Sequence, residues 1–154
     1  MGILVSPAYV DEDANGVILT KNIVDKTGPG FYVSIQVGNT PVTNPPPGIR
    51  SEEDLVYWDL NNPVKPFMFK QLQKSNLKIG NTPPPAKILT QAYADALGAA
   101  LAVAHKHFMK LNEEEEHADK FALDLEFRIH RLDGQPPRIF LKQARPYAEP
   151  KREE

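Results

Sequence analysis

Cysteine is absent from the 154-residue sequence, and tryptophan occurs only once. The lack of cysteine excludes disulfide bonds, thiolate nucleophiles and cysteine metal sites. An excess of basic residues is also missing, because 18 Lys and Arg stand against 20 Asp and Glu and give a net charge of -2. Nucleic-acid binding requires Lys and Arg concentrated on one face. We therefore expect no nucleic-acid partner.

Long apolar runs are missing as well. Three apolar residues follow Met1 and Gly2 before a Ser-Pro pair, so no signal peptide is visible. The longest weakly polar stretch, residues 92–104, contains Asp95 and is too short to cross about 30 Å of hydrocarbon. We expect a cytoplasmic protein without membrane contact. It should form a single domain over residues 1–154, in which the 41% hydrophobic residues fill one core.

Two Pro-Pro-Pro runs, at residues 45–47 and 83–85, divide the chain into three blocks. Proline removes a backbone donor, so neither run can lie inside a helix or a central strand. In the first block, apolar and mostly polar residues alternate on one side of a Gly-Pro-Gly turn, and β-branched residues are frequent on both sides. This pattern predicts two antiparallel strands at residues 16–20 and 31–37.

The second block, residues 51–81, leaves its secondary structure open. A Ser-Glu-Glu-Asp run at residues 51–54 indicates a possible capped turn. The second block also contains four aromatic residues. Aromatic residues at this density belong more often to the core than to an exposed surface that binds a peptide or a sugar. These residues are Tyr57, Trp58, Phe67 and Phe69.

The third block predicts an amphipathic helix over residues 86–111, because apolar residues recur there at helical spacing. They are Leu89, Tyr93, Leu97, Leu101 (or Ala100), Ala104, Phe108 and Leu111. The acidic run at residues 113–116 follows and could begin a short second helix, whose N-terminal end favours carboxylates. A solvated acidic surface is the simpler interpretation of this run than a metal site.

A terminal hairpin is predicted over about residues 121–146, followed by a tail at residues 147–154. The odd-numbered residues from 121 to 129 are apolar, which indicates a strand with one buried face. Asp133-Gly134 marks the turn, and residues 138–145 supply the return strand, which ends at Pro146.

A hairpin register centred near the Asp-Gly turn brings four polar side chains together on the face away from the core. Glu126 then lies opposite Gln143, and Asp124 lies opposite Arg145, with Cβ atoms about 5 Å apart. Spacing alone favours a cross-strand ion pair of Asp124 and Arg145 with Glu126 solvated, over a metal or phosphate site.

Two segments of this hairpin, FALDLEF at residues 121–127 and LKQARP at residues 141–146, resemble a known family. They look like the paired "(D)xEF…xxQ(A/T)RP" ending of the ATP-grasp domain in pyruvate phosphate dikinase, phosphoenolpyruvate synthase and related phosphotransferases. DANGVILTKN at residues 13–22 is similar to the family's "(S/N)GVxFTxNP" segment, although Ile23 replaces its usual proline. QVG at residues 36–38 lies where "(Q/G)xGE" follows, with Asn39 in place of the frequent glutamate. The resemblance covers nearly the whole chain.

The resemblance implies an α+β fold, in which an antiparallel sheet with packed helices forms the C-terminal, ATP-grasp-like subdomain of a nucleotide-binding domain. It also implies a site for Mg²⁺ and ATP. Glu126 and Gln143 would hold Mg²⁺, and Arg145 would clamp a phosphate oxygen as the catalytic group. Asp124 would orient Arg145 at the same cofactor site. Mg²⁺ takes few protein oxygens, and a planar guanidinium suits a phosphoryl group.

The phosphate-binding Lys and Arg of the family's N-terminal half would have to lie before Met1. The chain also has no room for a phosphohistidine domain or for the barrel that binds pyruvate or phosphoenolpyruvate. We therefore expect a part of an ATP-dependent phosphotransferase that works with the remaining domains of a larger or split enzyme. Alone, it should bind Mg-ATP weakly or not at all. The alternative is a non-catalytic binding or regulatory module that keeps the fold.

The sequence leaves the phosphoryl acceptor and the oligomeric state open. No histidine has a motif that resembles the family's phospho-carrier histidine, so we expect surface or helix-packing roles for all of them. They are His105, His107, His117 and His130.

Overall fold

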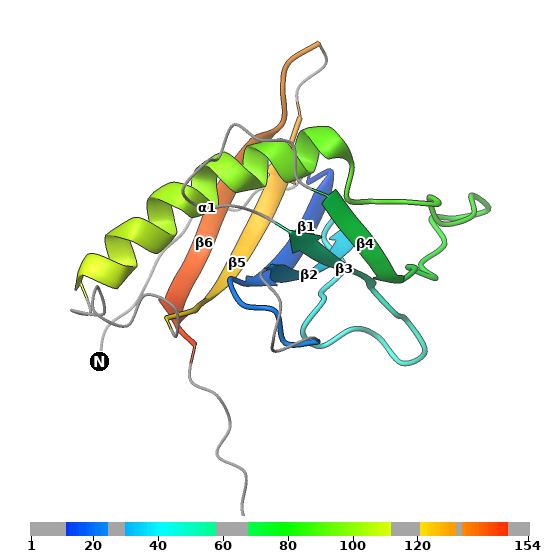
Figure 1. Cartoon of the computed structure of the whole chain (residues 1–154). Helices are drawn as coiled ribbons and strands as arrows, with labels where there is room; N and C mark the ends of the chain where they lie inside the picture. Colours follow the sequence, from blue (N-terminus) through cyan, green and yellow to red (C-terminus); the bar gives the residue numbers. More distant parts are fainter. Residues whose placement is uncertain (1–11, 25–29, 58–67, 112–120, 132–133, 148–154) are drawn as a thin grey trace, which may run out of the picture.

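The computed structural model of the chain describes five stretches, residues 12–24, 30–57, 68–111, 121–131 and 134–147. Its elements are β1 (Ala14–Leu19), β2 (Phe31–Val37), β3 (Glu52–Tyr57), β4 (Met68–Gln73), α1 (Gln91–Leu111), β5 (Leu123–His130) and β6 (Arg138–Pro146). The strands form one antiparallel sheet in the order β4-β3-β2-β1-β5-β6. Helix α1 lies across one face of this sheet (Figure 1). The predicted α+β class is confirmed.

The core lies between α1 and the sheet. Along β5 the side chains alternate between buried and half-buried, and the buried ones are the odd-numbered apolar residues, as predicted. Strands β1 and β2 form the predicted antiparallel pair and supply further core side chains. The largest fully buried apolar side chains are Ile18, Ile35, Leu89, Leu101, Leu123, Leu125, Phe127 and Ile129.

Residues 51–54 do not form the predicted capped turn. They enter β3, which pairs with β2 on one side and with β4 on the other. Two of the three carboxyl groups in this run, those of Glu52 and Asp54, are completely buried on the face toward the core. The prediction was wrong because a sequence pattern does not show that a strand buries its acidic residues.

The predicted helix is confirmed, but it begins at Gln91 and not at residue 86. Thr90 caps its start, because the Thr90 hydroxyl accepts a hydrogen bond from the Tyr93 N–H at 3.3 Å. The backbone preceding the cap bends outside the helix, and the N–H groups of Ile88 and Leu89 donate to the Glu52 carboxylate. At the other end Leu111 is 64% exposed, so it is not part of the buried face that the spacing predicted.

Several predictions concern residues outside the described stretches, or side chains that the structure does not describe. These are the acidic run at residues 113–116, the tail at residues 148–154, His117, Trp58, Phe67, Phe69 and the first residue of the Asp-Gly turn. Within the described stretches, no helix combines the length and the apolar character needed to cross a membrane.

Candidate functional site

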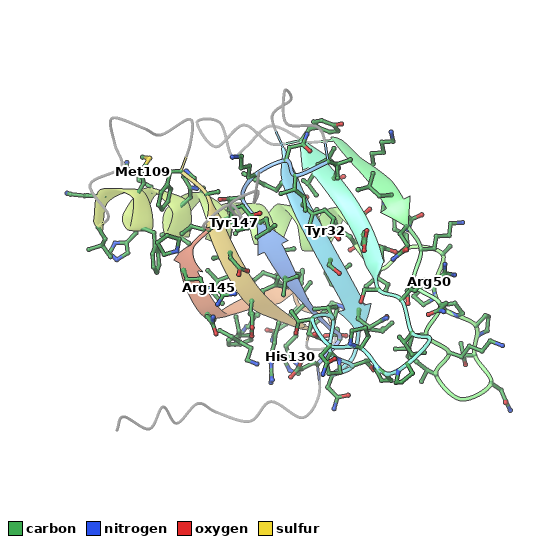
Figure 2. The ribbon with its side chains drawn as sticks, turned by 90° about the horizontal axis from the view of Figure 1, so that it is seen from below. Tyr32, Arg50, Met109, His130, Arg145 and Tyr147 are labelled. Atoms are coloured by element: carbon green, nitrogen blue, oxygen red, sulfur yellow. The ribbon has the colours of Figure 1, made fainter. Side chains whose placement is uncertain are left out.

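The two predicted cross-strand pairs of the terminal hairpin are confirmed. Asp124 pairs with Arg145, and Glu126 pairs with Gln143, across β5 and β6. These residues lie on the face of the sheet opposite α1, because the alternating residues of β5 are buried beneath the helix. Figure 2 looks onto this helix-free face, with Arg145 labelled on β6. The structure therefore brings all four predicted site residues together.

Asp124 and Arg145 form the cross-strand ion pair that spacing favoured. Nε and Nη2 of Arg145 both donate to Oδ2 of Asp124, at 2.9 and 2.6 Å. The Arg145 side chain is 65% exposed, whereas that of Asp124 is 22% exposed. Two bonds to one carboxylate oxygen fix the plane of the guanidinium group and leave its Nη1 amino group for another acceptor. The ion pair thus positions Arg145 without using all of its donors.

Glu126 faces a cavity of about 170 Å³ on the same side of the sheet. One wall consists of β1 and β5, from Asn15 to Val17 and from Glu126 to Arg128. The opposite wall is the segment after β2, residues 39 and 41–43. The Glu126 and Gln143 side chains make no hydrogen bond or ion pair with the part of the chain that the structure describes. Their oxygens are consequently available to a ligand.

Two further residues that line this cavity form a second ion pair, which the sequence did not predict. Nη1 of Arg128 contacts Oε1 of Glu12, whose side chain is only 2% exposed. Glu12 precedes β1, and Arg128 lies two residues beyond Glu126 on β5. A buried carboxylate next to a guanidinium balances the charge of that guanidinium locally. The pair therefore supports the cavity wall and adds no net charge to it.

Lys142 also lines this cavity, although no motif singled it out. The β5–β6 register shifts between Glu126 and Phe127, where Lys142 has no cross-strand partner. Alternation in the sequence does not reveal such a bulge. The only hint of the bulge in the sequence is a lysine directly before Gln143, because strict alternation would place this lysine on the other face of the sheet.

Among the histidines that the structure describes, only His105 is buried. The Thr20 hydroxyl accepts from the Leu123 N–H at 2.7 Å and lies 3.3 Å from Nδ1 of His105. The hydroxyl can therefore donate to a neutral ring. The edge of the His105 ring packs on Phe121, and burial lowers the pKa of His105. These contacts join α1 to β5 and give His105 a packing role.

The described residues contain no group of three or more His, Cys, Asp or Glu side chains arranged to hold a metal ion. Glu126 and Gln143 nevertheless fit the limited demand of Mg²⁺, which is often held by one or two protein oxygens together with phosphate and water. Comparisons of the chain with protein-family models, with curated proteins and with solved structures give no match. A functional proposal therefore rests on the sequence resemblance together with the hairpin geometry.

Proposed function

We propose that the chain is the C-terminal, ATP-grasp-like part of an ATP-dependent phosphotransferase of the pyruvate phosphate dikinase and phosphoenolpyruvate synthase type, acting in the cytoplasm. The observation that carries the proposal is the hairpin register. It places the Glu126–Gln143 pair next to the Asp124–Arg145 pair on one solvent-accessible face. Sequence resemblance supplied the roles of these residues, and the pairing makes those roles geometrically possible.

The two pairs divide the binding of a polyphosphate between them. Glu126 and Gln143 offer a carboxylate and an amide oxygen to Mg²⁺, which when bound neutralises phosphate charge. Arg145 offers its remaining N–H donors to a phosphate oxygen, and Asp124 holds the guanidinium in position. Phosphoryl transfer depends mainly on such positioning and charge neutralisation. The face is therefore suited to orient the phosphates of ATP.

The hairpin would form only one wall of the ATP cleft, and one wall cannot both position the phosphates and exclude water. Rate in phosphoryl transfer comes from holding the reactants in line and excluding water, which requires the opposite wall. We expect the isolated chain to fold, to bind Mg-ATP weakly or not at all, and to lack phosphoryl transfer. Robust ATP hydrolysis by the purified chain would contradict this part of the proposal.

The catalytic assignment is tested in a protein or complex that contains the N-terminal half of the domain. Glu126→Gln keeps the shape of the side chain but removes its charge, so turnover should fall and the dependence on Mg²⁺ should shift. Arg145→Lys keeps the charge but loses the planar fork, and we expect a loss of turnover on the order of 10² to 10³. Asp124→Asn should reduce turnover less, because Asp124 acts through Arg145.

The matched control is Arg138→Lys, an exposed arginine on the same strand that pairs with His130 at the other end of the hairpin. It should leave turnover unchanged. A simple surface ion pair predicts stability changes of about 1 kcal/mol or less and unaltered kinetics for all three site variants. Wild-type turnover in both Glu126→Gln and Arg145→Lys would favour the non-catalytic binding or regulatory module.

A further inference from the structure

The bulge in β6 gives the hairpin an additional residue next to Gln143. Glu126 pairs with Gln143, whereas the next residue of β5, Phe127, pairs with Leu141. Lys142 lies between these two pairs without a partner on β5. A bulge of this kind bends the strand and redirects one side chain. At this position the redirected side chain belongs to Lys142.

Without a bulge, Lys142 and Gln143 would point to opposite faces of the sheet, because successive side chains of a strand alternate. Gln143 shares the helix-free face with Glu126. A regular strand would therefore direct Lys142 toward the α1 side. Instead, Lys142 lines the cavity together with Glu126 and Arg128. The bulge thus places a cation and the proposed metal-binding pair on the same face.

The charge of Lys142 is not committed elsewhere in the described chain. Arg128, the other cation of the cavity, is paired with the buried carboxylate of Glu12. Lys142 is exposed, and it forms no hydrogen bond or ion pair with any residue that the structure describes. An ammonium group on a flexible stem is a point charge with three donors. Such a group binds phosphate oxygens readily.

From this placement, and on the basis of the proposed function, we propose that Lys142 is a further phosphate-binding residue of the site. It contacts the phosphate chain of ATP at the cavity beside Glu126, whereas Arg145 contacts it from the other side of Gln143. In the cavity wall, Glu126 offers a carboxylate to a divalent cation, and the adjacent Lys142 offers an ammonium group to the polyphosphate that the cation accompanies. The ligand recognised by Lys142 is therefore the polyphosphate group and not the nucleoside.

Amide chemical shifts of the ¹⁵N-labelled chain, titrated separately with Mg-ATP, Mg-tripolyphosphate and adenosine, test this proposal. We expect Mg-ATP and Mg-tripolyphosphate to shift signals of β5 and β6 near Glu126 and Gln143. Lys142→Ala should raise the dissociation constant for tripolyphosphate by about 2- to 10-fold, the net effect of losing one typical hydrogen bond. Lys142→Arg should restore most of the affinity. Shifts caused by adenosine should not depend on Lys142.

Lys70→Ala is the matched control, since Lys70 is an exposed lysine on β4 at the opposite edge of the sheet. It should bind tripolyphosphate like the wild type. If Glu126→Gln abolishes the shifts but Lys142→Ala binds normally, the role of Lys142 is wrong and the proposed function stands. If the wild type gives no shifts in β5 and β6 with either polyphosphate, both in the isolated chain and in the complex with the N-terminal half, both proposals are wrong. Unchanged spectra of the ligand-free variants establish that the substitutions preserve the fold.

Discussion

Gly16 lies on β1, between β2 and β5, and there is no space for a side chain on its α-carbon. Its backbone pairs with Ile35 on one side and with Phe127 on the other. A Cβ atom at this position would collide with the carbonyl oxygen of Ser34 and lie 2.5 Å from Cζ of Phe127. Gly16 belongs to the segment that resembles the family, and the packing of the sheet alone already requires glycine at this position. It allows the Phe127 ring to cover β1 beneath the helix.

We predict that Gly16→Ala destabilises the protein, because the added methyl group must displace either the β2 backbone or the Phe127 ring. Overpacking of this kind costs about 1 to 3 kcal/mol. Urea unfolding monitored by circular dichroism measures the change in the free energy of unfolding. An unchanged midpoint would mean that β1 and β5 are not packed as closely as described.

At the scale of elements, one buried carboxylate connects β3 to the start of α1. Oε2 and Oε1 of Glu52 accept hydrogen bonds from the N–H groups of Ile88 and Leu89, at 2.8 and 2.7 Å. Gln71 on β4 donates to the same carboxylate at 2.9 Å. Asp54, the next residue on this face of β3, is completely buried, and neither of its carboxyl oxygens has a hydrogen-bond partner among the described residues. Burial, and then the charge of Glu52, raise the pKa of Asp54 from its ordinary value of 3.8 to about 8.

This shift predicts a specific pH dependence of stability. Between about pH 4 and pH 8 the folded chain keeps a proton on Asp54 that the unfolded chain releases, so this group's contribution to stability falls as the pH rises. Asp54→Asn cannot ionise and should remove that decrease. The melting temperature of Asp54→Asn minus that of the wild type should therefore increase as the pH rises from about 5 to 9.

The matched control is Asp95→Asn, on the exposed side of α1. Its melting temperature should differ from that of the wild type by a constant amount over the same range. If Asp54→Asn and the wild type gave parallel curves, Asp54 would not be a protonated, buried acid.

The elements differ in how well the sequence predicted them. Alternation along residues 121–129 and the Asp-Gly turn were sufficient for the β5–β6 register near Glu126, because both signals are local. The start of α1 was predicted too early, because the backbone N–H groups of Ile88 and Leu89 donate to the Glu52 carboxylate, and these tertiary hydrogen bonds hold both residues outside the helix. Strand β3 was missed because two of its acidic residues, Glu52 and Asp54, are buried on the face toward the core, where a sequence pattern predicts apolar residues. The bulge at Lys142 depends on strand pairing, which no local pattern reveals.

At the scale of the whole molecule, the two faces of the sheet have separate roles. The face beneath α1 contains the apolar core. The opposite face carries the two cross-strand pairs and the cavity, which the Glu12–Arg128 ion pair helps to line. Substitutions of exposed polar residues on this second face should consequently change ligand binding more than folding. This separation makes the site testable by binding measurements on the folded chain.

The most direct test of the central claim locates the metal ion on the hairpin. Mn²⁺ takes the same oxygen ligands as Mg²⁺ and broadens the amide signals of nearby residues. With ATP and limiting Mn²⁺, we predict that signals around Glu126 and Gln143 broaden first, and that Glu126→Gln removes this selectivity. Broadening centred on another part of the chain, or selective broadening that persists in Glu126→Gln, would contradict the assignment of this face as the Mg-ATP site.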